Sequence, residues 1–443
     1  MFGHGIDTMS FAWRDFDAGV ALARSGGARP GSGDGRGAVP RSKGSADAGC
    51  EFGDERDAQC CDAASDSSLV PDVTTTATIT PRPFDSGLWA AAESGQAPES
   101  LRDLVQATFR GEREDQLTVA TVIADGCEPG ERLAQAGAGA VSGFAWAGPI
   151  AVLRVGEADN AYTVAVWPTT EEGVYNLVGT VPVTDERWRR IERWLANSAP
   201  RVVPFVLNQA DFEGVGAALA EHGRVEVSRL TARVLSDGSS YTRGWAEGRR
   251  APRPTYTQAL GEVEEFASVR TLTVHVGDLL SLHLRRQAGT TFYGGSFRLF
   301  EDVVLTALVG AAARRRSLLT GRERRAHARQ EHAIAVQMPT GIFANAESIS
   351  DLLEALCEQR GVGIAVLHRN PYLHVAVTDY LDGSNFDAFV TFDDRVLIYP
   401  GYRASVGALT RLTEHLAERF AAREVADVQA STPPTRDELF TTG

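Results

Sequence analysis

The chain has 443 residues, 43% of them hydrophobic, and a formal net charge of −14 at pH 7. Only one of its 44 Lys and Arg residues is a lysine, Lys43, and it lies in a Gly/Ser-rich stretch. This excludes mechanisms that need a placed lysine on phosphates or as a Schiff base. The length allows two or three domains, and the absence of any apolar run of about 18 residues predicts no membrane span. Five cysteines without CxxC spacing, and a start without a signal-peptide pattern, favour a cytosolic protein.

Both ends of the chain are expected to lie outside the packed core. Residues 1–82 are rich in Gly, Ser, Ala and Asp and poor in aliphatic side chains, a composition typical of disorder. Residues 427–443 are polar and are expected to fray. The sequence between them predicts two domains, 84–240 and 254–426, joined by a linker.

In the first expected domain, several strands precede a stretch in which strands and helices alternate. Alternating apolar and β-branched residues predict strands at Leu117–Ala124, Ile150–Val155, Tyr162–Trp167, Val174–Val183, Val202–Leu207 and Arg224–Leu235. Thr184 is the expected cap of a helix that buries Trp188, and Asn208 or Asp211 the cap of the next helix. The order of elements predicts an α+β fold with mixed or antiparallel sheets and packed helices.

The second expected domain begins with a helix and a strand hairpin over 269–285. A two-residue turn at Gly277-Asp278 would place His275 and His283 on opposite sides of the sheet, because side chains alternate along a strand. We therefore do not expect these two imidazoles to share a ligand.

The rest of this domain predicts a helix over 348–360, an antiparallel meander over 362–399 and a closing helix over 404–422. Asp382-Gly383 predicts a two-residue hairpin turn, which pairs Val377 with Ala388.

The meander holds the densest set of imidazole and carboxylate groups in the sequence, namely His368, His374, Asp379, Asp382 and Asp387. Such groups suit a metal or acid/base site. The expected register, however, separates His374 from Asp387 by about 13 Å and turns Asp379 to the opposite face. We therefore expect the Asp residues to serve the turns.

Charge is spread unevenly along the chain. Residues 240–330 hold 15 Arg and 8 acidic residues, so this stretch carries +7 and the remainder −21. Its sharpest cluster consists of Arg314, Arg315, Arg316, Arg322, Arg324, Arg325 and Arg329. Arginine suits bidentate contacts with phosphate, so these residues are candidates for polyanion binding. The alternative is that they form a solvated helix end or pair with acidic surface elsewhere.

No cofactor is expected, because Gly137-x-Gly139 lacks the remaining features of a dinucleotide-binding fingerprint. The leading hypothesis is a binding or regulatory protein that contacts nucleic acid, or another anionic partner such as an acidic protein surface, through the Arg-rich segment. One alternative is a hydrolase, metal-dependent or metal-independent, that uses His374 or His368 as base with Asp387 beside it. Another is a non-catalytic component of a larger assembly.

Overall fold

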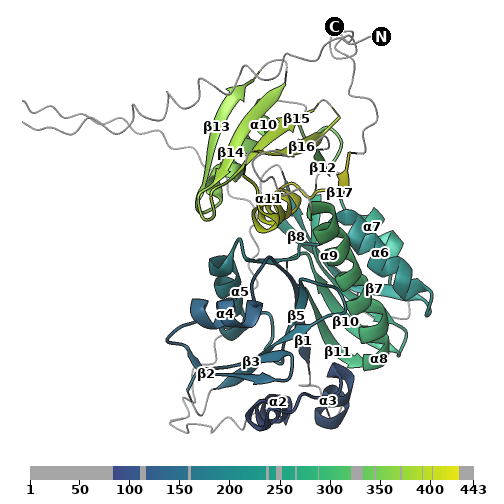
Figure 1. Ribbon diagram of the computed structural model, residues 1–443. Coiled ribbons are helices and arrows are strands. Elements are labelled where there is room, and N and C mark those ends of the chain that lie inside the picture. Colours follow the sequence, from purple (N-terminus) through teal and green to yellow (C-terminus); the bar gives the residue numbers. More distant parts are fainter. Residues whose placement is uncertain are drawn as a thin grey trace, which may run out of the picture. The chain divides into compact units, whose positions relative to one another are not determined.

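The computed structural model describes residues 83–428, apart from 110–115, 158–160, 236–238, 246–251, 265–266, 288, 321–332, 344–345, 370–371, 392 and 402. The expected tails, 1–82 and all but the first two residues of 427–443, lie outside the described residues. The described part combines helices with two antiparallel sheets, which confirms the predicted α+β class (Figure 1).

The larger sheet has the strand order β2-β3-β4-β5-β1-β11-β10-β9-β7-β8, and the short β6 pairs with β1. Its strands are β1 (Leu117–Ala124), β2 (Val141–Ala147), β3 (Ile150–Val155), β4 (Tyr162–Pro168), β5 (Val174–Gly179), β6 (Val202–Pro204), β7 (Val225–Val234), β8 (Ser240–Gly244), β9 (Ala267–Val276), β10 (Leu280–Arg285) and β11 (Gly289–Gly295). Strand β8 lies where the sequence predicts a linker. The last strand of the larger sheet ends at 295, and the first strand of the smaller sheet begins at 334. The larger sheet therefore contains strands from both sides of the predicted linker.

Helices accompany the larger sheet on both of its faces (Figure 1). They are α2 (Pro83–Ser94), α3 (Leu101–Thr108), α4 (Pro129–Ala136), α5 (Glu186–Ser198), α6 (Gln209–Ala220), α7 (Tyr256–Gly261), α8 (Phe297–Leu299), the π-helical η2 (Phe300–Leu305) and α9 (Thr306–Leu319). The N-cap of α5 is Asp185 rather than the predicted Thr184, because the Asp185 carboxylate accepts from the Arg187 backbone N–H. Asn208 caps α6 in a reciprocal capping box with Asp211, as the sequence predicts.

The two faces of the larger sheet are covered to different extents. One face buries a continuous apolar layer, from Val119 on β1 to Leu272 on β9, under α2, α3, α6, α7, α8, η2 and α9. On the other face, α4 and α5 bury Leu177 of β5 and Val122 of β1 beneath Leu133 and Trp188. This second cluster takes no residue from β7–β11.

The smaller sheet has the order β13-β14-β15-β16-β12-β17. Its strands are β12 (Ile334–Gln337), β13 (Val362–His368), β14 (Leu373–Asp379), β15 (Ser384–Val390), β16 (Arg395–Pro400) and β17 (Glu424–Asp427), and its helices are α10 (Ala346–Glu358) and α11 (Val406–Arg419). Leu352 of α10 and Leu409 of α11 pack in one apolar cluster with Val375 and Ala388 of the sheet. The predicted meander and closing helix are therefore confirmed.

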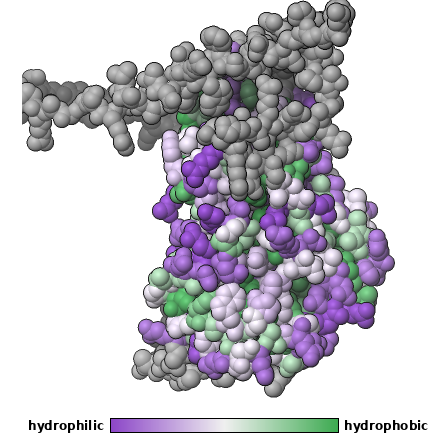
Figure 2. Space-filling model, in the orientation of Figure 1, coloured by the Kyte–Doolittle hydropathy of each residue, from purple (hydrophilic) through white to green (hydrophobic). Residues whose placement is uncertain are grey.

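In the orientation of Figure 1, hydrophilic side chains spread over the surface with smaller apolar patches between them (Figure 2). Among the described residues, no helix is both long enough and apolar enough to cross a membrane.

Candidate functional site

The register of the meander differs from the predicted one by two residues. Ala388 pairs with Val375, not with Val377, because the loop between β14 and β15 has four residues instead of two. The Asp379 carboxylate accepts from the Leu381 N–H and the Asp382 carboxylate from the Ser384 N–H, each at 2.9 Å. By accepting from these backbone N–H groups, the two carboxylates stabilise the four-residue loop.

The corrected register brings His374 and Asp387 together. His374 Nε2 and Asp387 Oδ1 are 2.9 Å apart, so the predicted separation of about 13 Å is wrong. The His374 ring also stacks on Phe389 at a centroid distance of 4.0 Å. Asp379 lies on the opposite, buried face, as predicted, where Arg411 binds it at 2.8 Å.

The remaining meander candidate, His368, does not join this pair. His368 is exposed and its ring packs against Tyr372, with 4.9 Å between the ring centroids. Within the part of the chain that is described, no group of three or more His, Cys, Asp and Glu side chains is placed to hold a metal ion. What the meander offers chemically is thus a single His–Asp pair.

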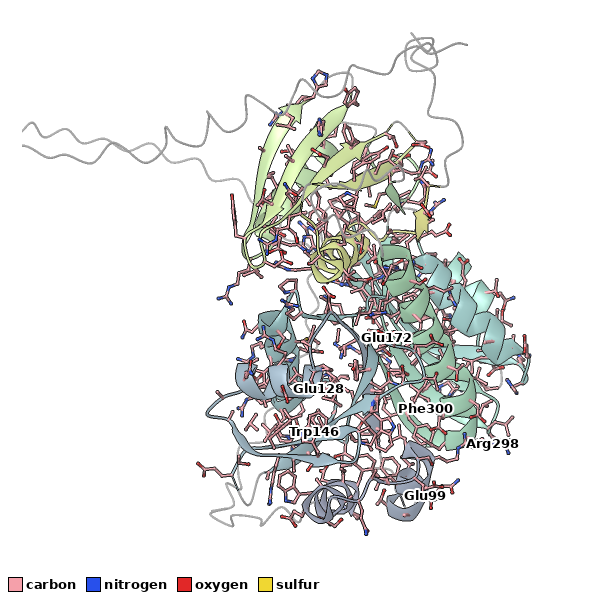
Figure 3. All side chains as sticks on the ribbon, in the orientation of Figure 1. Glu99, Glu128, Trp146, Glu172, Arg298 and Phe300 are labelled. Carbon is pink, nitrogen blue, oxygen red and sulfur yellow. The ribbon has the colours of Figure 1, made fainter. Side chains whose placement is uncertain are left out.

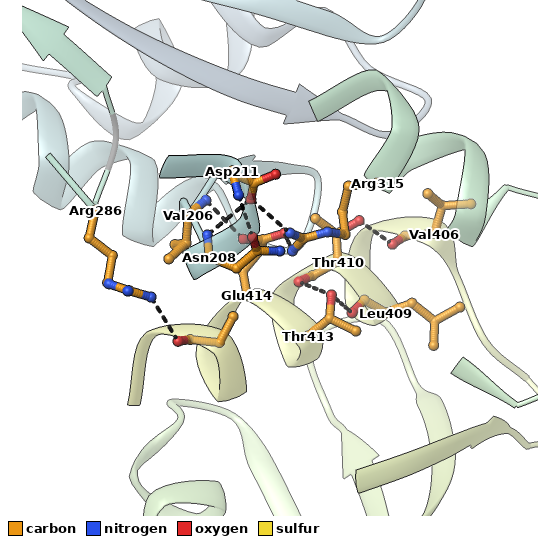
Figure 4. Close-up of polar contacts among 11 residues, drawn as sticks. Val206, Asn208, Asp211, Arg286, Arg315, Val406, Leu409, Thr410, Thr413 and Glu414 are labelled. Atoms are coloured by element: carbon orange, nitrogen blue, oxygen red, sulfur yellow. Dashed lines mark hydrogen bonds and ion pairs between the residues drawn. The ribbon is translucent and has the colours of Figure 1, made fainter. Parts of the chain in front are cut away.

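One member of the Arg-rich cluster, Arg315, does not lie on the surface that the sequence predicts. Arg315 is 4% exposed, and its guanidinium binds Glu414 of α11 at 2.6 Å and Asp211 of α6 at 3.3 Å (Figure 4). The guanidinium also lies over the Phe205 ring, 5.4 Å from its centroid. Arg315 is consequently not part of an accessible polyanion surface.

Glu414 is the buried partner in this network. Its second carboxylate oxygen accepts from the Val206 backbone N–H at 2.8 Å. Burial raises the pKa of Glu414 to about 7, against the lowering influence of Arg315. Removing one partner of such a pair would leave the other charge buried alone, which makes the network a strong link between α9 and α11.

The neighbours of Arg315 have separate environments. Arg314 is exposed, and Arg316 lies 3.7 Å from Glu172, which is labelled in Figure 3. The other expected members of the cluster, Arg322, Arg324, Arg325 and Arg329, lie outside the described residues.

The hairpin with His275 and His283 also has a different register from the predicted one. His275 pairs with Ser281 and His283 with Thr273, because the connecting loop has three residues rather than two. One extra loop residue reverses the facing of every side chain on one strand. The two imidazoles therefore share a face, and the prediction of opposite faces is wrong.

This shared face is the part of the larger sheet that α4 and α5 do not cover. We refer to it as the uncovered face. It carries polar side chains at alternate positions of the strands, namely Glu226, Ser228, Arg229, Thr231, Thr242, Thr271, Thr273, His275, Ser281, His283, Arg285, Thr291 and the adjacent Tyr293. The residues between them on β9 and β10 are apolar and buried on the opposite face.

Hydroxyl groups of neighbouring strands orient both imidazoles. His275 Nε2 lies 2.8 Å from Ser228 Oγ, and His283 Nδ1 lies 3.1 Å from Thr273 Oγ1. Burial, together with the charges of Arg285 and Arg229, lowers the pKa of His283 to about 4. His283 is therefore a neutral ring at physiological pH.

The two arginines of the uncovered face have different partners. Arg285 binds Glu192 of α5 at 3.0 Å, and the buried Arg285 Nη1 and Thr291 Oγ1 form no hydrogen bond with the described residues. Arg229 is exposed and has no carboxylate within ion-pair distance in the described part of the chain. Within the described residues, Arg229 thus supplies positive charge without a paired carboxylate, beside hydrogen-bonding groups that have no described partner.

Sequence reasoning missed this face although its signal is present. Thr271, Thr273 and His275 alternate with buried aliphatic residues, as Ser281, His283 and Arg285 do on the next strand. Alternation on both strands predicts that each strand has one polar face. The assumed two-residue turn placed the polar residues of the two strands on opposite faces of the sheet, whereas they lie on the same face.

Neither the known protein-family models nor the curated protein sequences give a match to this chain.

Proposed function

We propose that the protein is a binding protein that takes single-stranded nucleic acid on the uncovered face. The observation that carries this proposal is the exposed Arg229, which has no ion-pair partner among the described residues and lies among hydroxyl and imidazole groups of the uncovered face. Guanidinium, hydroxyl and imidazole N–H groups are the donors that proteins use toward phosphate and sugar oxygens.

Two features favour nucleic acid over an acidic protein segment. Tyr293 at the rim is 43% exposed, and its ring lies near His283, with 6.4 Å between the ring centroids. The positive charges of Arg229 and Arg285 act on Tyr293. An exposed aromatic ring near such cations can stack on a base while a cation contacts the backbone. An acidic peptide would use the charge of Arg229 but would leave the Tyr293 ring without a matching group.

Fluorescence anisotropy with a labelled polyuridylate oligonucleotide tests this proposal at low ionic strength. We expect salt-sensitive binding that Arg229→Ala weakens about three- to tenfold while lowering the salt slope by roughly one. The matched control is Arg314→Ala, which removes another exposed arginine, from α9.

The outcomes separate the alternatives. Unchanged affinity in Arg229→Ala with a loss in Arg314→Ala would move the contact to the Arg-rich segment and overturn the use of the uncovered face. Binding of labelled polyglutamate but not of polyuridylate would identify an acidic protein segment as the partner instead.

A second candidate function is a hydrolase centred on the meander, supported by the 2.9 Å contact between His374 and Asp387. A carboxylate that holds an imidazole in place can make that imidazole a general base. Hydrolysis of p-nitrophenyl esters or phosphates that His374→Ala abolishes without changing the melting temperature would favour this function. Equal hydrolysis by the variant and the parent protein would rule out this function.

A further inference from the structure

Arg286, directly after β10, is a buried cation to which no carboxylate of the described residues is hydrogen-bonded. The residue, labelled in Figure 4, is 1% exposed. Its Nε donates to the Val269 carbonyl at 2.6 Å, and its Nη1 lies 3.5 Å from the Ala417 carbonyl. The guanidinium also lies over the Phe212 ring, 5.6 Å from its centroid. Burial lowers the pKa of Arg286 to about 10, so the side chain stays charged at neutral pH.

The neighbouring Arg315 shows what Arg286 lacks. Arg315 has two carboxylates within 3.3 Å, whereas no described carboxylate lies within ion-pair distance of Arg286. Its remaining nitrogen, Nη2, forms no hydrogen bond with the described residues. The charges of Glu418 and Asp211 act on Arg286 from beyond ion-pair distance, but neither carboxylate bonds its guanidinium. The Nη2 donor is therefore available to an anion supplied from outside the chain.

Arg286 lines a pocket of about 450 Å³ between α6, the segment before β9 and the start of β17. A pocket of this size falls in the range that small-molecule sites occupy. Beside Arg286, its lining includes the aliphatic Leu260 and Val263 and the charged Glu213, Glu264, Arg423 and Glu424. Both positive charge and apolar surface are therefore available to one ligand.

Apart from Arg286, the pocket lining has three carboxylates and one further cation, the exposed Arg423, so negative charge prevails there. Glu213, Glu264 and Glu424 are exposed and line the pocket, and none of them forms an ion pair with the described residues. Glu213 accepts a hydrogen bond from the Gln209 amide at 3.1 Å, which orients its carboxylate. Carboxylates in this number oppose a multiply charged anion such as phosphate and favour a cationic group on the ligand.

We propose that this pocket binds a free amino acid, with its carboxylate on Arg286 and its ammonium group on the glutamates, chiefly Glu213. The guanidinium offers a carboxylate directed hydrogen bonds at the buried end of the pocket. The ammonium group meets acidic side chains at the exposed end, and the aliphatic Leu260 and Val263 lie beside the ligand side chain.

Isothermal titration calorimetry on the full chain, with each standard L-amino acid in turn, tests the assignment. At least one amino acid is expected to bind saturably. Its N-acetyl derivative, which lacks the ammonium group, and its amide, which lacks the carboxylate, are each expected to bind at least tenfold more weakly.

Three variants locate the site. Arg286→Gln is expected to abolish binding, and Glu213→Gln, at an exposed position that leaves the fold intact, to weaken it about tenfold. Glu221→Gln, at the exposed end of the same helix and outside the pocket lining, is the matched control and should bind normally.

Three results would overturn the proposal. They are no saturable heat with any amino acid, equal binding of the N-acetyl derivative, or unchanged affinity in Glu213→Gln. Because Glu213→Gln does not touch the buried arginine, this last result decides even if Arg286→Gln fails to fold. None of these results bears on nucleic-acid binding by the uncovered face, which uses other residues.

Discussion

One face of the larger sheet consists of two regions with the same antiparallel pairing and opposite chemistry. Under α4 and α5, the strands present Ala120, Val122 and Leu177, and every residue of β1 is buried. On the uncovered face, β10 alternates between buried and half-buried residues, with His283 at its centre. Residues buried on both sides of a strand therefore mark a helix-covered region, while strict alternation marks a surface left open to solvent or a partner.

The largest expected effect is a difference between the two regions in how much a substitution destabilises the protein. Trp188 of α5 is 1% exposed, so Trp188→Ala should lower the free energy of unfolding by about 3–5 kcal/mol through lost burial and a residual cavity. Tyr293→Ala, on the uncovered face, should cost less than about 1 kcal/mol because the ring is already partly solvated. Urea denaturation of both variants measures the contrast, and equal losses would contradict it.

A smaller change concerns the pH dependence of stability. The pKa of His283 is lowered from its ordinary value of 6.5 to about 4, mainly by burial. Between these values the unfolded chain binds a proton that the folded chain does not, so the free energy of unfolding should fall by roughly 1–3 kcal/mol as pH drops from about 6.5 to 4.

Denaturation curves across this pH window test the contribution of His283. His283→Gln should remove this part of the pH dependence, whereas His222→Gln, at an exposed position after α6, should retain it. A His283→Gln curve parallel to that of the parent protein would show that the imidazole protonates freely in the folded state.

The least change is expected at the boundary between the two regions. Thr118 of β1 and Thr291 of β11 are paired across the strands and both are buried, but only Thr118 has a hydroxyl partner among the described residues, the Val181 carbonyl at 2.9 Å. Thr118→Val should therefore cost about 1 kcal/mol, and Thr291→Val should be neutral or stabilise by up to about 1 kcal/mol.

Melting temperatures and urea midpoints of both valine variants measure this difference. Equal destabilisation in the two variants would indicate that the Thr291 hydroxyl is satisfied in solution, for example by a bound water.

Strand positions were predictable here because alternation is a local property of the sequence. The strands 117–124 and 150–155 coincide with β1 and β3, and the buried positions of β14 are the expected ones. Registers were not predictable, because they depend on loop lengths that side-chain bonds decide. Asp379 and Asp382 extend one hairpin loop to four residues, and Leu279 adds a third residue to another.

The same contrast between strand positions and registers applies to the candidate sites. The His374–Asp387 pair and the coincidence of His275 with His283 were lost through register errors of two residues and one residue. Glu414, one of the two partners of Arg315, lies 99 residues further along the chain, and no local pattern indicates such a contact. The sequence therefore predicts which strand carries each polar residue, but not which polar residues contact one another.

The ion pairs of Arg315 have a practical consequence for anyone producing this protein in pieces. A boundary placed between Leu319 and Ile334 would give one fragment with Arg315 and Asp211 and another with Glu414. The second fragment would have to bury a lone carboxylate or expose the apolar side of α11, and either choice promotes aggregation. Expression of residues 83–428 as one polypeptide keeps both charges matched.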